Sequence, residues 1–243
     1  MHGQFIEGEK LKSQEYLNQI NEWTNDHKMI ISEKKTKAMV FNFTDNHQFT
    51  TRLDLKGSNI EIVDKMKILG TIVDSGLSWD DNCSMLIKKV NARMQLIRSL
   101  QSFGASTEEM VHMWILFCRS VLEQSCVVWG TSLTQENKDD LERTQRTFAK
   151  LVLRERYKNC DNALMLLDLD TLEKRRQDLI LKFAKNGIKN GTLSDLFPIN
   201  DKTHNMQTRD DEVYKVKFAN TNRLKHSSIV TMQNMLNDDA RKT

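Results

Sequence analysis

The sequence predicts an α+β fold, in which a small N-terminal part with one helix and two hairpins precedes a mainly α-helical bundle. Apolar side chains recur at helical spacing over residues 11–23, and short runs of β-forming residues follow them. From about residue 79 on, longer stretches with helical spacing begin after polar residues suited to cap a helix. We therefore expect three domains, at residues 1–78, 79–157 and 158–243.

The strands of the N-terminal part are expected in two hairpins. Residues 38–43 and 49–55 are rich in β-forming residues and flank the turn pair Asp45-Asn46, which predicts the first hairpin. The second hairpin is expected between residues 60–63 and residues 66–73.

Four helices are expected after residue 79, and polar residues mark where the first three begin. These caps are Asp80 or Asp81, Ser106 or Thr107, and Thr134. Beyond Pro198 the pattern is weak and predicts only one strand and one short helix. The four helices are expected at residues 80–102, 106–130, 134–156 and 170–187, the weak strand at 213–218 and the weak helix at 229–236.

Composition excludes several classes of protein. Hydrophobic residues make up 39% of the chain and charged residues 28%, which is typical of a folded globular protein. The net charge of +3, from 36 Lys and Arg against 33 Asp and Glu, is too small to indicate a polyanionic partner by itself. The four cysteines form no CxxC pair, so we expect neither a zinc site nor a disulfide framework. Free cysteines of this kind suit a reducing compartment, which we therefore expect for this protein.

Targeting and membrane signals are absent from the sequence. The most apolar stretch, residues 110–129, contains Arg119 and Glu123, and a charge at the centre of a bilayer costs about 2.5–3.5 kcal/mol. We therefore expect a buried helix in an intracellular protein, located in the nucleus or the cytoplasm.

The first long helix carries the best candidates for phosphate contacts. Lys88, Lys89 and Arg93 fall within about 140° of arc on a helical projection. No acidic residue occurs between Met85 and Gln101, so no neighbour at i,i+4 neutralises them. This arrangement is typical of a surface that follows a phosphate backbone.

The other cation clusters are interpreted as solvated helix surface. Arg143, Arg146, Lys150 and Arg154 share an arc of about 80° on the third helix, but acidic residues precede the first two at i,i+4. The cluster at residues 174–176 is given the same interpretation.

Catalytic motifs are missing. The sequence has no GxGxxG, P-loop, HExxH or GxSxG motif. The pair Asp80-Asp81 offers oxygen donors of the type that binds Mg²⁺, but adjacent helical residues point about 100° apart and this pair begins a helix. We expect no catalytic and no metal-binding residue in this chain.

In their order along the chain, these segments resemble the C-terminal part of reverse transcriptases from non-LTR (LINE-like) retrotransposons. Residues 29–43, with Lys35-Thr36 ahead of a strand, resemble the segment after the family's catalytic hairpin, although Ser32 replaces the usual asparagine. Residues 67–79 resemble the primer-grip hairpin and its exit into the thumb. Further landmarks are residues 20–23, 119–123, 128–130, 141–146, 172–176, 196–198, 223–229 and 235–237.

The resemblance implies a palm remnant at residues 1–78, a thumb-like bundle after it, and a C-terminal helical extension. The family's catalytic aspartates would precede residue 1, so the isolated chain is expected to be no enzyme, although the family is an RNA-directed DNA polymerase. Mg²⁺ is expected only in the full-length family enzyme, and no cofactor is expected here.

The resemblance also implies six residues that contact nucleic acid. Thumb helices hold the primer–template duplex through phosphates, which implicates Lys88, Lys89 and Arg93. Lys35 corresponds to a position near the incoming nucleotide, and Leu69 and Gly70 to the turn of the primer grip. The expected partner is an RNA–DNA or DNA duplex, bound weakly and in a salt-sensitive way, and the missing fingers and palm are a further candidate partner.

Other interpretations stay open at this point. A helical scaffold or protein-interaction remnant would have no nucleic-acid role, and a palm remnant without fingers would expose apolar surface to a partner. A relic without function is also consistent with the sequence, which gives no sign of duplex preference or oligomeric state.

Overall fold

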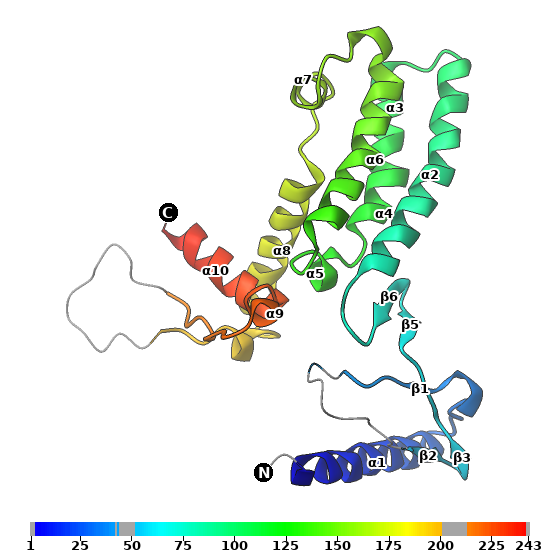
Figure 1. Cartoon of the computed structure of the whole chain (residues 1–243), viewed down its shortest axis with the longest axis vertical. Coiled ribbons are helices and arrows are strands. Elements are labelled where there is room, and N and C mark those ends of the chain that lie inside the picture. The colour runs from blue at the N-terminus through cyan, green and yellow to red at the C-terminus, as the bar shows by residue number, and fades with distance from the viewer. Residues whose placement is uncertain (1–2, 42, 44–51, 201–212, 242–243) are drawn as a thin grey trace, which may run out of the picture. The chain divides into compact units, whose positions relative to one another are not determined.

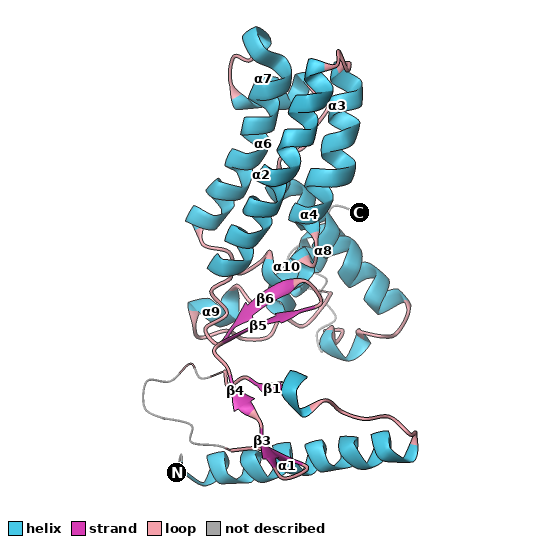
Figure 2. Cartoon of the chain, turned by 90° about the vertical axis from the view of Figure 1, so that its right-hand side faces the viewer, coloured by secondary structure: helices cyan, strands magenta, loops and turns pink. Residues whose placement is uncertain are grey.

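The computed structural model describes residues 3–41, 43, 52–200 and 213–241 (Figure 1). The chain divides into two compact units, Met1–Leu77 and Ser78–Thr243, called unit 1 and unit 2 below. Unit 1 combines a long helix with short strands, and unit 2 is mainly helical, as an α+β class requires (Figure 2). Unit 2 continues across the boundary expected after residue 157, because α8 (Leu172–Lys189) packs against α6 (Gln135–Leu153).

Unit 1 contains α1 (Gly3–Asp26), the 3-10 helix η1 (Glu33–Lys35) and short paired strands. The Gln14 side chain on α1 accepts from the Asp54 N–H at 2.9 Å and donates to the Asp54 C=O at 2.8 Å, which anchors the second strand to this helix. The strand pairs are β1 (Lys37–Ala38) with β4 (Glu61–Ile62) in parallel, and β2 (Asp54–Leu55) with β3 (Ser58–Asn59) and β5 (Lys65–Ile68) with β6 (Thr71–Asp74) antiparallel.

The strand pairing expected from the sequence is wrong. Ala38 pairs with Ile62, and the turn expected at Asp45-Asn46 lies outside the described residues. Residues 65–74 fold on themselves instead of pairing with residues 60–63. The reason is the Leu69-Gly70 connection, whose two residues have φ values of 47° and 92°, because a two-residue turn with positive φ at both positions matches the twist of antiparallel strands.

The helices of unit 2 begin mostly where the sequence predicts. α2 (Asp80–Ser102) and α3 (Thr107–Met113) have the expected starts, and Ser106 forms a capping box with Glu109. Thr134 caps α6 as expected. The cap expected for α2 is wrong: Trp79 occupies that position, and the Asp80 carboxylate accepts from Asn137 of α6 at 2.7 Å. Figures 1 and 2 show α2, α3 and α6 side by side in the bundle.

The second expected helix is broken. α3 leads into a π-helical segment, η2 (Trp114–Arg119), and then into α4 (Ser120–Glu123); α5 (Cys126–Trp129) follows a bend at Ser125, whose φ is 55°. Apolar residues occupy most positions of this stretch, so the helical period carries no sign of the break. The bend places the Trp129 ring so that its Nε1 donates to the Gln124 carbonyl at 2.9 Å.

Two short elements follow α6 that the sequence does not predict. α6 ends at Leu153 and a 3-10 turn, η3 (Arg154–Arg156), takes the place of its expected last residues. α7 (Cys160–Leu166) is capped by Asn159, which accepts from the Asn162 N–H at 2.9 Å.

The core of unit 2 lies between α2, α6 and the helical pieces of residues 107–129. Trp114 and Phe148 stack there with ring centroids 4.5 Å apart, and both side chains are fully buried. The fully buried residues around them include Val90, Cys118, Leu122, Trp129 and Leu141. This arrangement leaves the opposite face of α2 to solvent.

A second apolar cluster joins α8 to α10 (Ser228–Ala240). Its buried members are Ile180, Ala184, Phe197, Met232 and Leu236. The strand expected at residues 213–218 is wrong, because the described part of this segment forms a single β-bridge, between Tyr214 and Ile199. The Asn237 side chain takes the place of a neighbouring strand: it accepts from the Tyr214 N–H at 2.8 Å and donates to the Tyr214 C=O at 3.0 Å. The short helix α9 (Asn222–Lys225) connects this segment to α10.

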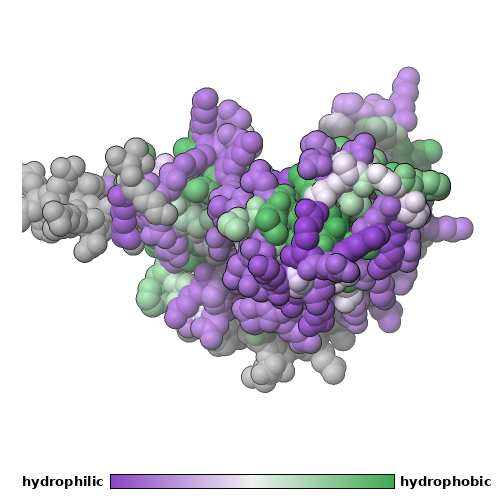
Figure 3. All heavy atoms as spheres, turned by 90° about the horizontal axis from the view of Figure 1, so that it is seen from above, coloured by the Kyte–Doolittle hydropathy of each residue, from purple (hydrophilic) through white to green (hydrophobic). Residues whose placement is uncertain are grey.

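The surface of the molecule is mixed in character. No helix in the described ranges is long and apolar enough to cross a membrane. Figure 3 shows hydrophilic residues over most of one face, with apolar residues in separate patches between them.

The cysteines allow a direct test of the core. Burial raises the pKa of the Cys83 thiol to about 12 and those of Cys118 and Cys126 to about 11, whereas Cys160 is only half-buried. Because the thiolate is the reactive form, iodoacetamide is expected to modify Cys160 first and the other three only as unit 2 unfolds. Mass spectrometry after timed labelling at pH 8 measures this order. Rapid labelling of Cys83 in the folded chain would contradict it.

The same pKa values determine how stability depends on alkaline pH. Between pH 9 and pH 11 the unfolded thiols lose protons that the buried thiols retain, so the unfolded state binds fewer protons than the folded state. The free energy of unfolding of unit 2 is therefore expected to fall as the pH rises through this window.

Candidate nucleic-acid interface

One face of α2 is buried and the opposite face carries cations. Cys83, Leu86, Val90, Met94 and Ile97 point into the core. Lys88 and Arg98 are exposed and Lys89 is half-buried. At 1.5 Å per residue, the 23 residues of α2 extend over about 34 Å. The helix thus presents a long, regular surface with basic residues along it.

Lys88 and Lys89 are available to a ligand. In the part of the chain that the structure describes, neither side chain makes a hydrogen bond or an ion pair. The absence of acidic residues on α2 between Met85 and Gln101 explains why no helical neighbour pairs with them.

Arg93 differs from the two lysines because it has a partner inside the protein. It is half-buried, and its Nη1 donates to the backbone carbonyl of Phe117 in the π-helical segment η2. Sequence reasoning grouped Arg93 with the lysines because a helical projection shows neither the neighbouring segment nor its carbonyl. The structure gives this arginine a role in joining α2 to η2.

This difference predicts separate effects for the three cations. Arg93→Ala removes a charge-assisted hydrogen bond and is expected to lower the free energy of unfolding by about 1–2 kcal/mol. Lys88→Ala, on the exposed face of the same helix, is expected to change it by less than about 0.5 kcal/mol. Urea unfolding followed by circular dichroism measures both. Equal free energies of unfolding for the two variants would contradict a structural role for Arg93.

The remaining expected contacts lie in unit 1. Lys35 is the last residue of η1 and is exposed. Leu69 and Gly70 form the turn of the β5–β6 hairpin, where Leu69 is 93% exposed. A leucine with positive φ is strained relative to glycine or asparagine at the same position. The hairpin tip therefore presents a large apolar side chain that its backbone conformation disfavours.

Most other cations of unit 2 that the sequence singles out have internal partners. Arg143 forms an ion pair with Asp140 at 2.8 Å, and the Lys150 ammonium lies 5.3 Å from the centre of the Tyr157 ring. These contacts agree with the interpretation of α6 as a solvated face. Lys174 forms an exposed ion pair with Asp170 at 2.6 Å.

The interpretation of residues 174–176 as helix surface is wrong for the two arginines. Arg175 donates to both carboxylate oxygens of Glu123, at 2.9 and 3.3 Å. Arg176 is buried, with 2% of its surface exposed. A charged triplet gives no sign of this, because the burial of Arg176 depends on packing against distant segments, which bring Cys126 of α5 and Glu142 of α6 near it.

Metal ligands are not gathered in the described ranges, where no three His, Cys, Asp or Glu side chains form a group that could hold a metal ion. Asp80 instead accepts a hydrogen bond from Asn137 of α6.

In comparisons with known proteins, no protein-family model, no curated protein and no solved structure matches this chain.

Proposed function

We propose that this chain is the C-terminal part of a retrotransposon-type RNA-directed DNA polymerase, and that it binds primer–template duplex through phosphates without catalysing polymerisation alone. The observation that carries the proposal is the exposed face of α2, where Lys88 and Lys89 have no partner in the described chain and no acid within reach along the helix. The order of sequence landmarks supports the family, and α6, η2, α4 and α3 pack against α2.

The geometry of α2 supports phosphate contact and not base reading. A straight helix of about 34 Å with lysines on one face suits a duplex backbone, and lysine acts on phosphate as a point charge without sequence preference. Binding through so few cations is weak, and the number of phosphates contacted determines how far it falls with salt.

Fluorescence anisotropy with a labelled RNA–DNA hybrid tests the proposal. Over a salt series, log K is expected to fall linearly with log salt, with a slope of about −0.9 for each phosphate neutralised, taking the B-DNA coefficient for the hybrid. A chain with a cooperative thermal transition that does not bind the hybrid at low salt would overturn the proposal.

A protein-interaction role is the second candidate, and a specific surface favours it. Where α2 ends and α3 begins, Phe103 is 87% exposed, and a shallow pocket of about 570 Å³ is lined by Leu100, Phe103, His112 and Met113. Exposed apolar surface of this kind is typical of protein contacts. If the folded chain does not bind the hybrid, the protein-interaction role becomes the better supported of the two functions.

A further inference from the structure

The guanidinium group of Arg176 is buried in unit 2 without a hydrogen-bond partner. Within the described residues, neither Nη1 nor Nη2 of Arg176 has an acceptor. The nearby carboxylates of Glu142 and Glu173 act on it electrostatically, but their hydrogen bonds go elsewhere. Glu142 accepts from the Glu173 backbone N–H at 2.8 Å, and Glu173 accepts from Lys138 at 2.8 Å.

An unpaired buried charge of this kind is costly. Native proteins pair nearly all buried polar groups, and a buried charged donor without an acceptor is among the least favourable arrangements. Burial accordingly lowers the pKa of Arg176, while Glu142 and Glu173 oppose this change. The protein therefore holds two strong donors for which the described residues provide no acceptor.

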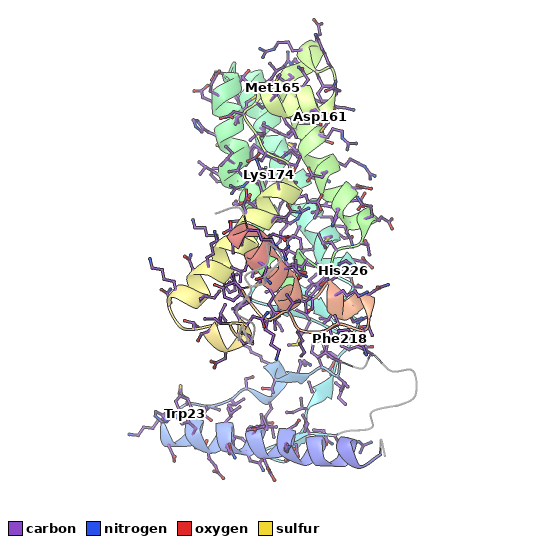
Figure 4. All side chains as sticks on the ribbon, turned by 90° about the vertical axis from the view of Figure 1, so that its left-hand side faces the viewer. Trp23, Asp161, Met165, Lys174, Phe218 and His226 are labelled. Carbon is purple, nitrogen blue, oxygen red and sulfur yellow. The ribbon has the colours of Figure 1, made fainter. Side chains whose placement is uncertain are left out.

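Arg176 lines a pocket of about 190 Å³, and its other polar residues, apart from Glu173, have side chains that can donate a hydrogen bond. Lys138 comes from α6, Gln177 from α8 and Thr231 from α10. His226, labelled in Figure 4, follows α9. Gly130 also lines the pocket, and a Cβ placed there would lie 3.5 Å from the Arg176 Cδ. That is an ordinary contact distance, and the close contact of such a Cβ would be with the Cys126 carbonyl oxygen, at 2.5 Å.

The size of the pocket limits what it can hold. Pockets for drug-sized ligands enclose about 300–1,000 Å³, so a volume of 190 Å³ is small for a nucleoside. It is larger than the roughly 30 Å³ that one water takes up in the liquid. A phosphate group fits between these limits, and the fork of an arginine matches two phosphate oxygens.

Charge balance in the pocket favours an anion of low charge held by hydrogen bonds. Lys138 and Arg176 contribute two positive charges, and Glu173 and the nearby Glu142 contribute two negative charges. Net attraction is therefore small, and the unpaired donors of Arg176 supply the binding. The monoanionic form of phosphate meets this requirement better than a dianion.

We propose that the pocket between α6, α8 and α10, with Arg176 at its base and Lys138 at its rim, binds a phosphate group. The group is either free inorganic phosphate or the terminal phosphate of a larger ligand. This inference does not rest on the proposed function, because the pocket lies on other helices than Lys88 and Lys89.

Binding of inorganic phosphate to the full chain tests the proposal. Equilibrium dialysis with labelled phosphate, at constant ionic strength and pH 6, is expected to show one saturable site, and phosphate is expected to raise the melting temperature. Arg176→Met preserves the volume of the side chain and removes its donors, and it is expected to weaken binding on the order of tenfold or more. Lys182→Met, which removes an exposed lysine of the same helix outside the pocket, is the matched control and should bind as the unaltered chain does.

Further variants keep the result interpretable. If Arg176→Met fails to show a cooperative melt, Lys138→Met tests the same pocket from its partly exposed rim. The double variant Lys88→Ala/Lys89→Ala should retain phosphate binding even where it loses the nucleic acid, which separates this proposal from the proposed function. A dinucleotide with a 5′-phosphate that competes with inorganic phosphate, beside an unphosphorylated one that does not, would assign the site to the end of a larger ligand.

Two results would overturn the proposal. One is the absence of saturable phosphate binding to the folded chain. The other is equal binding by Arg176→Met and Lys182→Met, because binding would then be a property of the general surface.

Discussion

Replacing Trp114 with alanine is expected to lower the free energy of unfolding of unit 2 by about 3–5 kcal/mol. The Trp114 side chain is fully buried and stacks on Phe148 with an angle of 12° between the ring planes. It is the first residue of η2, so its ring fixes the π-helical segment against α6. Removing it leaves a large cavity that the surrounding α-helices, already packed to crystal-like density, fill only in part.

Urea unfolding followed by circular dichroism measures this effect as a lower midpoint with an unchanged slope. Leu116→Ala is the matched control, because Leu116 lies in the same π-helical segment and is 65% exposed. Its effect is expected within about 0.5 kcal/mol. If Trp114→Ala shifted the midpoint no more than Leu116→Ala, the stacked pair would not be the centre of the core.

Replacing both Lys88 and Lys89 with alanine is expected to reduce the salt slope of hybrid binding by about 1.8, since each phosphate contact contributes about 0.9. At 0.1 M salt the same relation corresponds to a loss of affinity on the order of tens of fold. The effect should be similar for hybrids of different sequence, because phosphate contacts carry no base information.

The control for this pair is a cation of the same unit that already has a partner. Lys174 of α8 is paired with Asp170, which precedes that helix, so Lys174→Ala is expected to leave the salt slope unchanged. Arg93→Ala is expected to reduce the slope less than Lys88→Ala or Lys89→Ala does alone, because Nη1 of Arg93 already donates to the Phe117 carbonyl. A slope that falls equally for Lys174→Ala and the double variant would mean that binding follows net charge and not the face of α2.

The long helices of unit 2 could be predicted because the evidence for them is local. Ser106, Glu109 and Thr134 act on backbone groups three residues away, so a short stretch of sequence specifies these helix starts. The breaks at η2 and Ser125 depend on packing of an apolar stretch against α2 and α6, which no local pattern encodes. The prediction of the strand pairs in unit 1 failed for a related reason, since partners such as Ala38 and Ile62 are distant in sequence.

The candidate sites show the same division. The exposed face of α2 follows from helical spacing and the absence of acids, both visible in the sequence. The engagement of Arg93 with η2 and the burial of Arg176 arise from contacts between segments far apart along the chain, and a basic residue looks the same in sequence whether it is solvated or enclosed.

The late position of α10 has a consequence for synthesis. α10 covers Ile180 and Ala184 of α8, and its Ser228 donates to the Val128 carbonyl of α5 at 3.1 Å. On a translating ribosome, α10 begins 39 residues after α8 ends, from Lys189 to Ser228, a delay of about 2–8 s at 5–20 residues per second. During that interval the apolar face of α8 is exposed on the nascent chain, so this is the stage at which a chaperone can bind that face.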